Sequence, residues 1–269
     1  MSWARKLGVG GALVAVFAVT AVVGPWVAPH DPLRIDLAHS FAPPSAEHPL
    51  GTGDNGVDLA SALLYGARRA GVVGLFVVVF SALVGTLLGA WAGLRGGRLD
   101  SWLSVVADVV QAFPGVILYI ALLALVDRPG TTHVVGALCV SGWVLYARIA
   151  RAEALTLREA EFVQAATALG ATRGRVLWRH VLPNLLGPIV IQATSGFGGV
   201  VVAEATLSFL GLGPTDGVSW GALLDQGSGV LLRFPHVALV AGSAIALTVF
   251  GFNLAGDRLR DLLDPRGRR

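Results

Sequence analysis

The sequence predicts an all-α, polytopic membrane protein with six transmembrane helices, on two observations. The first is composition, because 54% of the 269 residues are hydrophobic, 14% are charged, and a mean hydropathy of +0.70 is too apolar for a soluble domain. The second is spacing. Apolar runs of about 20 residues, long enough to cross a hydrocarbon core of about 30 Å, recur near 7–27, 70–93, 102–126, 133–150, 185–209 and 236–256.

Basic residues predict the orientation of these spans. With the N-terminus inside the cell, fifteen of the 20 lysines and arginines fall in internal segments and five in external ones, as the positive-inside rule requires. The pI near 9.6 then reflects topology and not nucleic-acid binding. We therefore expect a cytoplasmic N-terminus and first helix at residues 1–27 and an external loop at 28–69. A five-helix core follows at 70–256 and contains a cytoplasmic loop at 151–183. Residues 257–269 are expected to form a cytoplasmic tail.

The first apolar run is expected to be a retained span and not a cleaved signal peptide, because it continues to Val27 without a small-residue cleavage site. In the external segment that follows, Asp58 is expected to cap a short helix through Ala67. This segment also holds three histidines spaced nine residues apart, which we expect to be solvated side chains and not metal ligands: His30, His39 and His48.

The second and third spans carry residues that ordinary lipid-facing helices lack. The second has a glycine every fourth residue, a stripe that lets another helix approach closely, either from this chain or from a second subunit: Gly85, Gly89 and Gly93. In the third, Asp108 should face protein or water because a charge in hydrocarbon is costly. Gln111 lies on the same span, and Pro114 should kink it. The single cysteine, Cys139, is expected to be a small packing residue in the fourth span.

The segment between the fourth and fifth spans is the most informative part of the chain. Apolar residues at i, i+3, i+4 and i+7 predict an amphipathic helix, namely Phe162, Ala165, Ala166 and Leu169. Gly170 stands where a left-handed C-terminal cap belongs. Thr172 should begin a second, arginine-bearing helix that runs until Pro183. The prediction is a helix-turn-helix between membrane spans.

This segment resembles the EAA loop of ABC importer permeases, in which two small residues, a glycine and a later Leu-Pro recur. The corresponding residues are Ala165-Ala166, Gly170 and Leu182-Pro183, with Gln164 where the family has Glu, so that Glu161 is the candidate acid. The resemblance implies that this loop contacts an ATPase, through a set of residues that also includes Arg175.

Three further motifs resemble the dipeptide, oligopeptide and nickel subgroup of these permeases. They are the external His48-Pro49-Leu50-Gly51-Thr52, the fifth-span ending from Glu204 to Gly213 (E-x-x-L-S-F-L-G-L-G), and the tail from Gly256 to Pro265. The resemblance covers nearly the whole chain and is to the shorter-loop permease subunit. It implies a bacterial cytoplasmic membrane protein, with Asp108, Gln111, Pro114 and Glu204 as candidates for the translocation path or its gating.

The resemblance also implies the assembly: a second homologous permease, two cytoplasmic ATPases that bind ATP and Mg²⁺, an external binding protein and membrane lipid, with no nucleic acid. This chain is expected to bind no cofactor or metal and to be no enzyme, because it has no phosphate-binding loop or paired-histidine zinc motif. Peptides are the expected substrate, with nickel or another small solute as the alternative. An intramembrane enzyme and a self-sufficient channel or secondary transporter remain rival classes, and neither accounts for the cytoplasmic helix-turn-helix.

Overall fold

The computed structural model describes residues 3–214 and 217–263, and its elements in these ranges are helices joined by loops. Their bounds are α1 Trp3–Val27, α2 Leu59–Arg95, α3 Gly97–Ala112, α4 Gly115–Leu123, α5 Thr131–Arg158, α6 Glu161–Ala168, α7 Arg173–Val176, α8 Leu182–Phe209, α9 Trp220–Gly229 and α10 Pro235–Leu263. Two short 3₁₀ helices, Leu37–His39 and Asp54–Gly56, lie in the outer segment, and a π-helix, Leu177–Val181, joins α7 to α8. The predicted all-α membrane fold is confirmed.

Five helices in the described ranges are long and apolar enough to span a membrane, and the α3–α4 pair makes a sixth if it is counted as one span. The predicted third span, 102–126, is not a single kinked helix, because α3 and α4 meet at 82°. The cause is Pro114. It forces Phe113 into an extended conformation (φ −87°, ψ 133°), which ends α3 and makes Pro114 the residue before α4.

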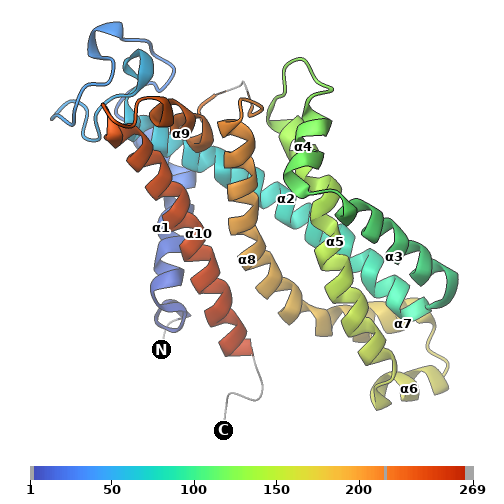
Figure 1. Ribbon diagram of the computed structural model, residues 1–269. Coiled ribbons are helices and arrows are strands. Elements are labelled where there is room, and N and C mark those ends of the chain that lie inside the picture. Colours follow the sequence, from blue (N-terminus) through green and yellow to red (C-terminus); the bar gives the residue numbers. More distant parts are fainter. Residues whose placement is uncertain (1–2, 215–216, 264–269) are drawn as a thin grey trace.

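The central element is α2, which packs along the whole length of α5 (Figure 1). A Cβ atom added to Gly85 or Gly89 would collide with the α5 backbone at Trp143 and Ala147, and one added to Gly93 would lie 2.8 Å from the Arg151 carbonyl. The glycine stripe is therefore a helix-packing face within this chain. The predicted short helix after Asp58 is wrong in extent, because α2 runs unbroken from Leu59 to Arg95.

The fifth span is also longer than predicted. Residues Arg173–Phe209 form one helical rod of 37 residues through α7, the π-helix and α8, and neither Pro188 nor the neighbouring glycines break it. Pro183 does not end the preceding helix. It lies in the first turn of α8, and the π-turn before it, closed by the Leu182 N–H donating to Leu177 O, carries the helix past a residue that has no N–H.

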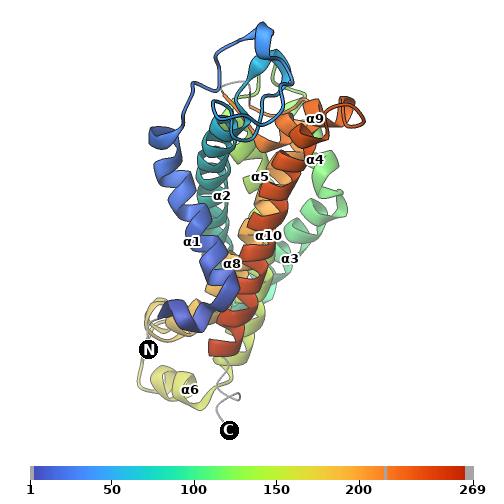
Figure 2. The ribbon, with the colours of Figure 1, turned by 90° about the vertical axis from the view of Figure 1, so that its left-hand side faces the viewer.

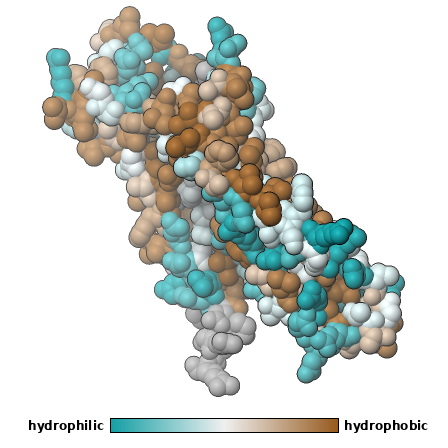
Figure 3. Space-filling view, turned by 45° about the vertical axis from the view of Figure 1, so that its right-hand side comes forward, coloured by the Kyte–Doolittle hydropathy of each residue, from teal (hydrophilic) through white to brown (hydrophobic). Residues whose placement is uncertain are grey.

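The helices place the loops at two opposite ends of the molecule. In Figures 1 and 2, α1 begins and α10 ends at the lower end, where α6 and α7 also lie, whereas the outer segment 28–58 and α9 lie at the upper end. Three aromatic rings join α1, α8 and α10. Phe197 of α8 stacks on Phe252 of α10 with ring centroids 4.2 Å apart, and Phe17 of α1 lies edge-on to both. Figure 3 shows hydrophobic side chains over the middle of one face and hydrophilic ones gathered toward its lower end.

Candidate functional site

The turn after α6 has the backbone geometry that its sequence predicts. Gly170 has φ +87°, and the last turn of α6 is closed by a Schellman motif, in which Gly170 N–H donates to Thr167 O at 2.9 Å and Ala171 N–H to Ala166 O at 3.0 Å. Thr172 then caps α7, since its side chain accepts from the Arg175 N–H at 3.3 Å. The predicted helix-turn-helix is present, although its second helix continues into α8.

The apolar stripe on α6 does not pack into this chain. Val163 is the one buried residue of α6, at 3% exposure, and it joins a core formed with α7 and the π-helix. Of the predicted stripe, Phe162 is 46% exposed and Leu169 is 90% exposed, while Ala165 is exposed and Ala166 half-buried. Trp178 on the adjoining π-helix is 67% exposed. The described part of the chain therefore leaves these apolar side chains uncovered at the lower end of the molecule.

The polar members of the predicted coupling set also lie on this surface. Glu161 occupies the first turn of α6, where a carboxylate is favourable near the helix N-terminus, and Gln164 donates from Nε2 to Glu159 O at 3.1 Å. Arg175 is exposed on α7, whereas Leu182 is half-buried and Pro183 is exposed. Glu161 and Gln164 thus flank the apolar stripe.

Asp108 lies on α3, and its side chain points toward α5. Its carboxylate accepts from Arg148 Nη2 on α5 at 2.7 Å, and the side chains of the pair remain 70% and 48% exposed. They line a hollow of about 380 Å³ between α3 and α5. Gln111 and Phe113 follow Asp108 in the sequence, at the break before α4, and both are exposed. Because charged groups are costly in hydrocarbon, we expect this exposed ion pair to face protein or water and not lipid.

Glu204 lies apart from Asp108. It is 2% exposed inside α8, and its Oε1 accepts from Ser208 Oγ at 2.9 Å, one helical turn along. The structure therefore does not bring the two predicted pathway carboxylates together. Because Glu204 is buried and hydrogen-bonded within α8, its position favours a structural role in that helix over direct contact with a substrate.

The sequence-based reasoning did not anticipate several contacts in the described part of the chain. Asp100 accepts two hydrogen bonds from Arg151, one of them from Nη2 at 2.7 Å, and so ties α3 to α5. The expectation that the outer histidines are solvated is wrong for two of them, because His30 and His48 are 26% and 13% exposed and both approach Asp58. Cys139 packs in an apolar cluster, as predicted. The tail motif residues Asp264 and Pro265 lie outside the described residues.

The profile of the family described as "binding-protein-dependent transport system inner membrane component" matches residues 85–269, more than half of the chain. The chain belongs to this family. A second profile, the N-terminal transmembrane domain of oligopeptide transport permease C, matches residues 8–44 of this permease. The protein is thus a multi-pass inner membrane component of a transport system and not a catalytic subunit.

Relatives of the permease match along its whole length. It is 37% identical over 255 residues to the probable D,D-dipeptide transport system permease protein of Escherichia coli, covering 94% of this chain and 85% of that protein. It is 36% identical over 275 residues to the dipeptide permease of Bacillus subtilis, covering 100% and 86%. To the oligopeptide permease of the same organism it is 34% identical, covering 98% and 87%.

A chain of the MetNI methionine ABC transporter, solved in inward-facing conformations, has the same fold. The superposition has a TM-score of 0.60 over 76% of this permease and 96% of that chain, at 18% identity. At that identity the likeness concerns the arrangement of helices alone.

Proposed function

We propose that this permease forms one half of the translocation pathway of an ATP-driven importer for dipeptides and oligopeptides. The support is that relatives named as dipeptide and oligopeptide permeases match 94–100% of the chain at 34–37% identity. A binding-protein-dependent system works with a binding protein and an ATPase. In our proposal these are one external binding protein and two cytoplasmic ATPases, which hold the ATP and Mg²⁺, together with a second, homologous permease.

One observation carries the coupling role of α6 and α7. Phe162, Ala165 and Leu169 form an apolar stripe that this chain leaves exposed, on a helix held in place by the buried Val163. A groove on an ATPase subunit would bury this stripe, and movement of the ATPase would then move α8, because α7 is continuous with that span. We expect Glu161, Gln164 and Arg175 to form the polar rim of the contact.

A cross-link tests this contact directly. With Cys139 replaced by Ala, a cysteine at Ala165 should cross-link to a cysteine in the groove of the ATPase subunit in the assembled complex. A cysteine at Thr156 is the matched control, because this residue is also exposed but lies on the last turns of α5, before α6 begins. Equal cross-linking at both positions, or none at Ala165, would contradict the proposed docking surface.

The orientation belongs to the same proposal: both ends of the chain and residues 151–183 face the cytoplasm. The arginine and lysine distribution supports it, as does the position of α6 and α7 at the same end as the start of α1 and the end of α10 (Figure 1). A cysteine at the exposed Thr172, in the Cys139→Ala background, should label only after the cells are permeabilised. Labelling by an impermeant reagent in intact cells would reverse the topology.

The face of α3 and α5 that carries Asp108 and Arg148 is proposed to line the path, against the second permease. Its hollow combines charged side chains with small apolar ones. That environment suits a zwitterionic peptide backbone better than bulk lipid.

The substrate assignment is tested with the complete transporter in proteoliposomes, loaded with ATP and supplied with the binding protein. Labelled dipeptide should accumulate and Ni²⁺ should not. Accumulation of Ni²⁺ without dipeptide uptake would identify the metal-importing branch of the family and would leave the coupling proposal intact.

A further inference from the structure

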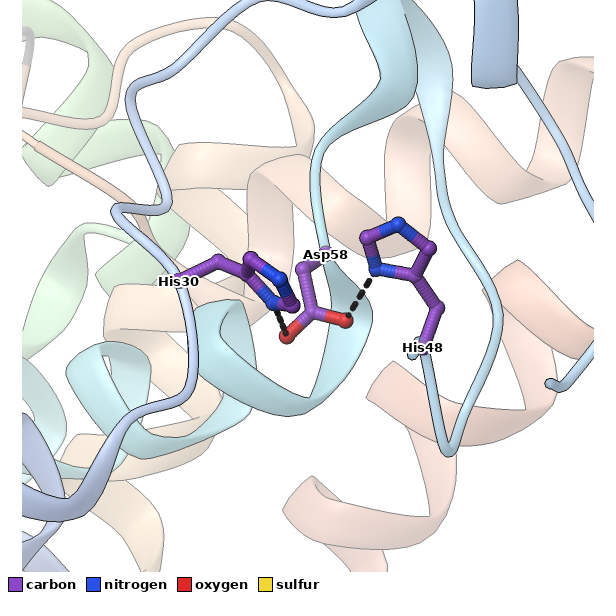
Figure 4. Close-up of side chains that lie close together, drawn as sticks. All are labelled: His30, His48 and Asp58. Atoms are coloured by element: carbon purple, nitrogen blue, oxygen red, sulfur yellow. Dashed lines mark hydrogen bonds and ion pairs between the residues drawn. The ribbon is translucent and has the colours of Figure 1, made fainter. Parts of the chain in front are cut away.

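The outer segment brings three side chains together that are far apart in the sequence (Figure 4). His30 follows α1, His48 lies in the loop, and Asp58 precedes α2. The Nδ1 atom of His48 lies 3.0 Å from Asp58 Oδ1, and that of His30 lies 3.8 Å from Asp58 Oδ2. One nitrogen or oxygen from each of the three side chains lies within 4.8 Å of the others, so two imidazoles and a carboxylate converge on one point.

The backbone around these side chains is held by contacts other than their own. The His30 N–H donates to Ser61 Oγ at 3.0 Å, and the Asp58 carboxylate caps α2 by accepting from the Ser61 N–H at 2.8 Å. The Leu59 N–H donates to Gly51 O at 3.1 Å, and this bond holds the segment that follows His48 against the start of α2. Hydrogen bonds to residues outside the cluster thus help to hold the three side chains near one another.

One atom of the cluster is unsatisfied. His30 Nδ1 is buried and has no hydrogen-bond partner in residues 3–214 and 217–263, apart from its 3.8 Å approach to Asp58. His39 shows the ordinary alternative, because its Nδ1 lies 2.9 Å from the exposed Asp36 and its side chain is 56% exposed. A buried imidazole nitrogen without a protein partner is satisfied by a bound ion or by water.

The surroundings favour a cation. A hollow of about 60 Å³ adjoins the cluster, more than the roughly 15 Å³ that one water needs. It is lined by one arginine, Arg34, and by four acidic side chains: Asp31, Asp36, Glu47 and Asp58. There is room for an ion and for the waters that would complete its coordination.

We propose that His30, His48 and Asp58 bind a divalent transition-metal ion of the zinc and nickel class. Imidazole nitrogen with carboxylate oxygen suits these ions, whereas Ca²⁺ and Mg²⁺ prefer oxygen ligands alone. Ligand atoms around a tetrahedral ion are about 3.3 Å apart, given metal–ligand bonds of about 2.0 Å. His48 Nδ1 and His30 Nδ1 lie 3.0 and 3.8 Å from the two Asp58 oxygens, and one ligand atom from each residue lies within 4.8 Å of the others, so a small adjustment of the side chains would bring all three to that spacing. Water would fill the remaining positions.

The bound ion would link the end of α1, the middle of the outer loop and the start of α2. It would therefore hold the outer segment against the span that packs along α5. This is a resident site at the upper end of the molecule, separate from the translocation surface of Asp108 and Arg148. It does not require that the transported solute be a metal.

The test uses the full-length permease in detergent micelles, purified through a tag without histidine and stripped with a chelator. Zn²⁺ and Ni²⁺ are titrated calorimetrically, with Mg²⁺ as the negative probe, and the melting temperature is recorded at each concentration. We expect one Zn²⁺ per chain, an increase in melting temperature with Zn²⁺, and no response to Mg²⁺. Co²⁺ should give the visible absorption of a nitrogen-liganded ion.

His30→Ala is the decisive variant, because its side chain makes no hydrogen bond and its loss should leave the metal-free fold intact. It should weaken Zn²⁺ binding at least tenfold, and His48→Ala should do the same. His39→Ala, three residues from Asp36 and outside the cluster, is the matched control and should bind as the wild type does. Absence of Zn²⁺ binding in the wild type, or equal binding in His30→Ala and His39→Ala, would overturn the proposal.

Discussion

The Asp58 carboxylate is buried, at 2% exposure, and accepts hydrogen bonds from Ser61 and His48. Burial disfavours its ionised form, but hydrogen bonds from the Ser61 hydroxyl and N–H and from His48 outweigh that cost and hold the pKa of Asp58 below its ordinary value of 3.8. A depressed pKa means that the ionised carboxylate stabilises the fold at neutral pH. That stabilisation is lost as the pH falls below 3.8 and through the lowered pKa.

Replacement of Asp58 by Asn should expose this dependence. At pH 7, with a chelator present, we expect Asp58→Asn to destabilise the purified permease by about 1–2 kcal/mol, because hydrogen bonds to a charged acceptor are lost. The difference from wild type should shrink as the pH falls below 3.8 and through the lowered pKa of Asp58, where wild-type Asp58 becomes protonated. Melting temperatures across this range check the prediction, with Asp54→Asn as the control. A constant difference at all pH values would show that the charge of Asp58 contributes nothing.

Two acidic residues on α3 should behave differently. The Asp100 side chain is 16% exposed and doubly hydrogen-bonded to Arg151, whereas Asp108 is 70% exposed and singly bonded to Arg148. We expect Asp100→Asn to lower the melting temperature, because it leaves a partly buried arginine unpaired. Asp108→Asn should change stability by less than about 1 kcal/mol, since exposed ion pairs contribute little.

The same pair of variants tests the proposed path. In proteoliposomes, Asp108→Asn should lower peptide uptake several-fold although the protein stays folded. Asp100→Asn, compared at a temperature where it is folded, should retain more uptake than Asp108→Asn. Wild-type uptake by Asp108→Asn would remove Asp108 and Arg148 from the translocation surface.

Among the elements, the α2–α5 contact depends on glycine. An added side chain at Gly89 would meet the Ala147 backbone, whereas one at Gly136 on α5 would meet no heavy atom within 4 Å. Gly89→Val should therefore destabilise the permease by about 3 kcal/mol or prevent its accumulation, because two packed backbones must separate. Gly136→Val is the matched control and should accumulate normally. Thermal unfolding and membrane yield measure both, and similar values for the two variants would contradict the packing described.

The sequence predicted those features of the elements that depend on local chemistry. The caps at Asp58 and Thr172, the left-handed turn at Gly170 and the close-packing role of the glycine stripe follow from residues within a few positions of each other. The 82° break at Pro114 is larger than the predicted kink, because the proline not only removes a hydrogen bond but also holds Phe113 in an extended conformation that ends α3. Pro183 lies in the first turn of α8, as its sequence position predicts, but it does not separate two helices, because a π-turn joins α7 to α8 just before it.

Contacts between distant residues could not be predicted in this way. Arg148 is 40 positions from Asp108, and His30 is 28 positions from Asp58, so their pairing depends on how the loops and spans fold together. The exposure of the α6 stripe could not be predicted either, because an amphipathic pattern predicts an apolar face but not whether this chain or a partner covers it.

At the scale of the whole molecule, the central claim is that the α6–α7 turn transmits motion between ATPase subunits and the spans. The turn places an exposed apolar stripe at one end of a 37-residue rod that runs through α8. Its geometry depends on Gly170, whose φ of +87° costs other residues about 1–2 kcal/mol, and more for a β-branched side chain. Gly174, four residues on, also has open space around an added Cβ but lies in α7 without positive φ.

Peptide-stimulated ATP hydrolysis by the assembled transporter, compared between Gly170→Val and Gly174→Val, tests the claim most directly. Both variants should insert and assemble, because neither added Cβ meets a neighbouring atom. Gly170→Val should lose most of the stimulation by peptide and binding protein, as the strained turn misplaces the α6 stripe, while Gly174→Val should retain it. Full stimulation in Gly170→Val, or an equal loss in both variants, would contradict the claim that the geometry of this turn couples the ATPase subunits to the membrane spans.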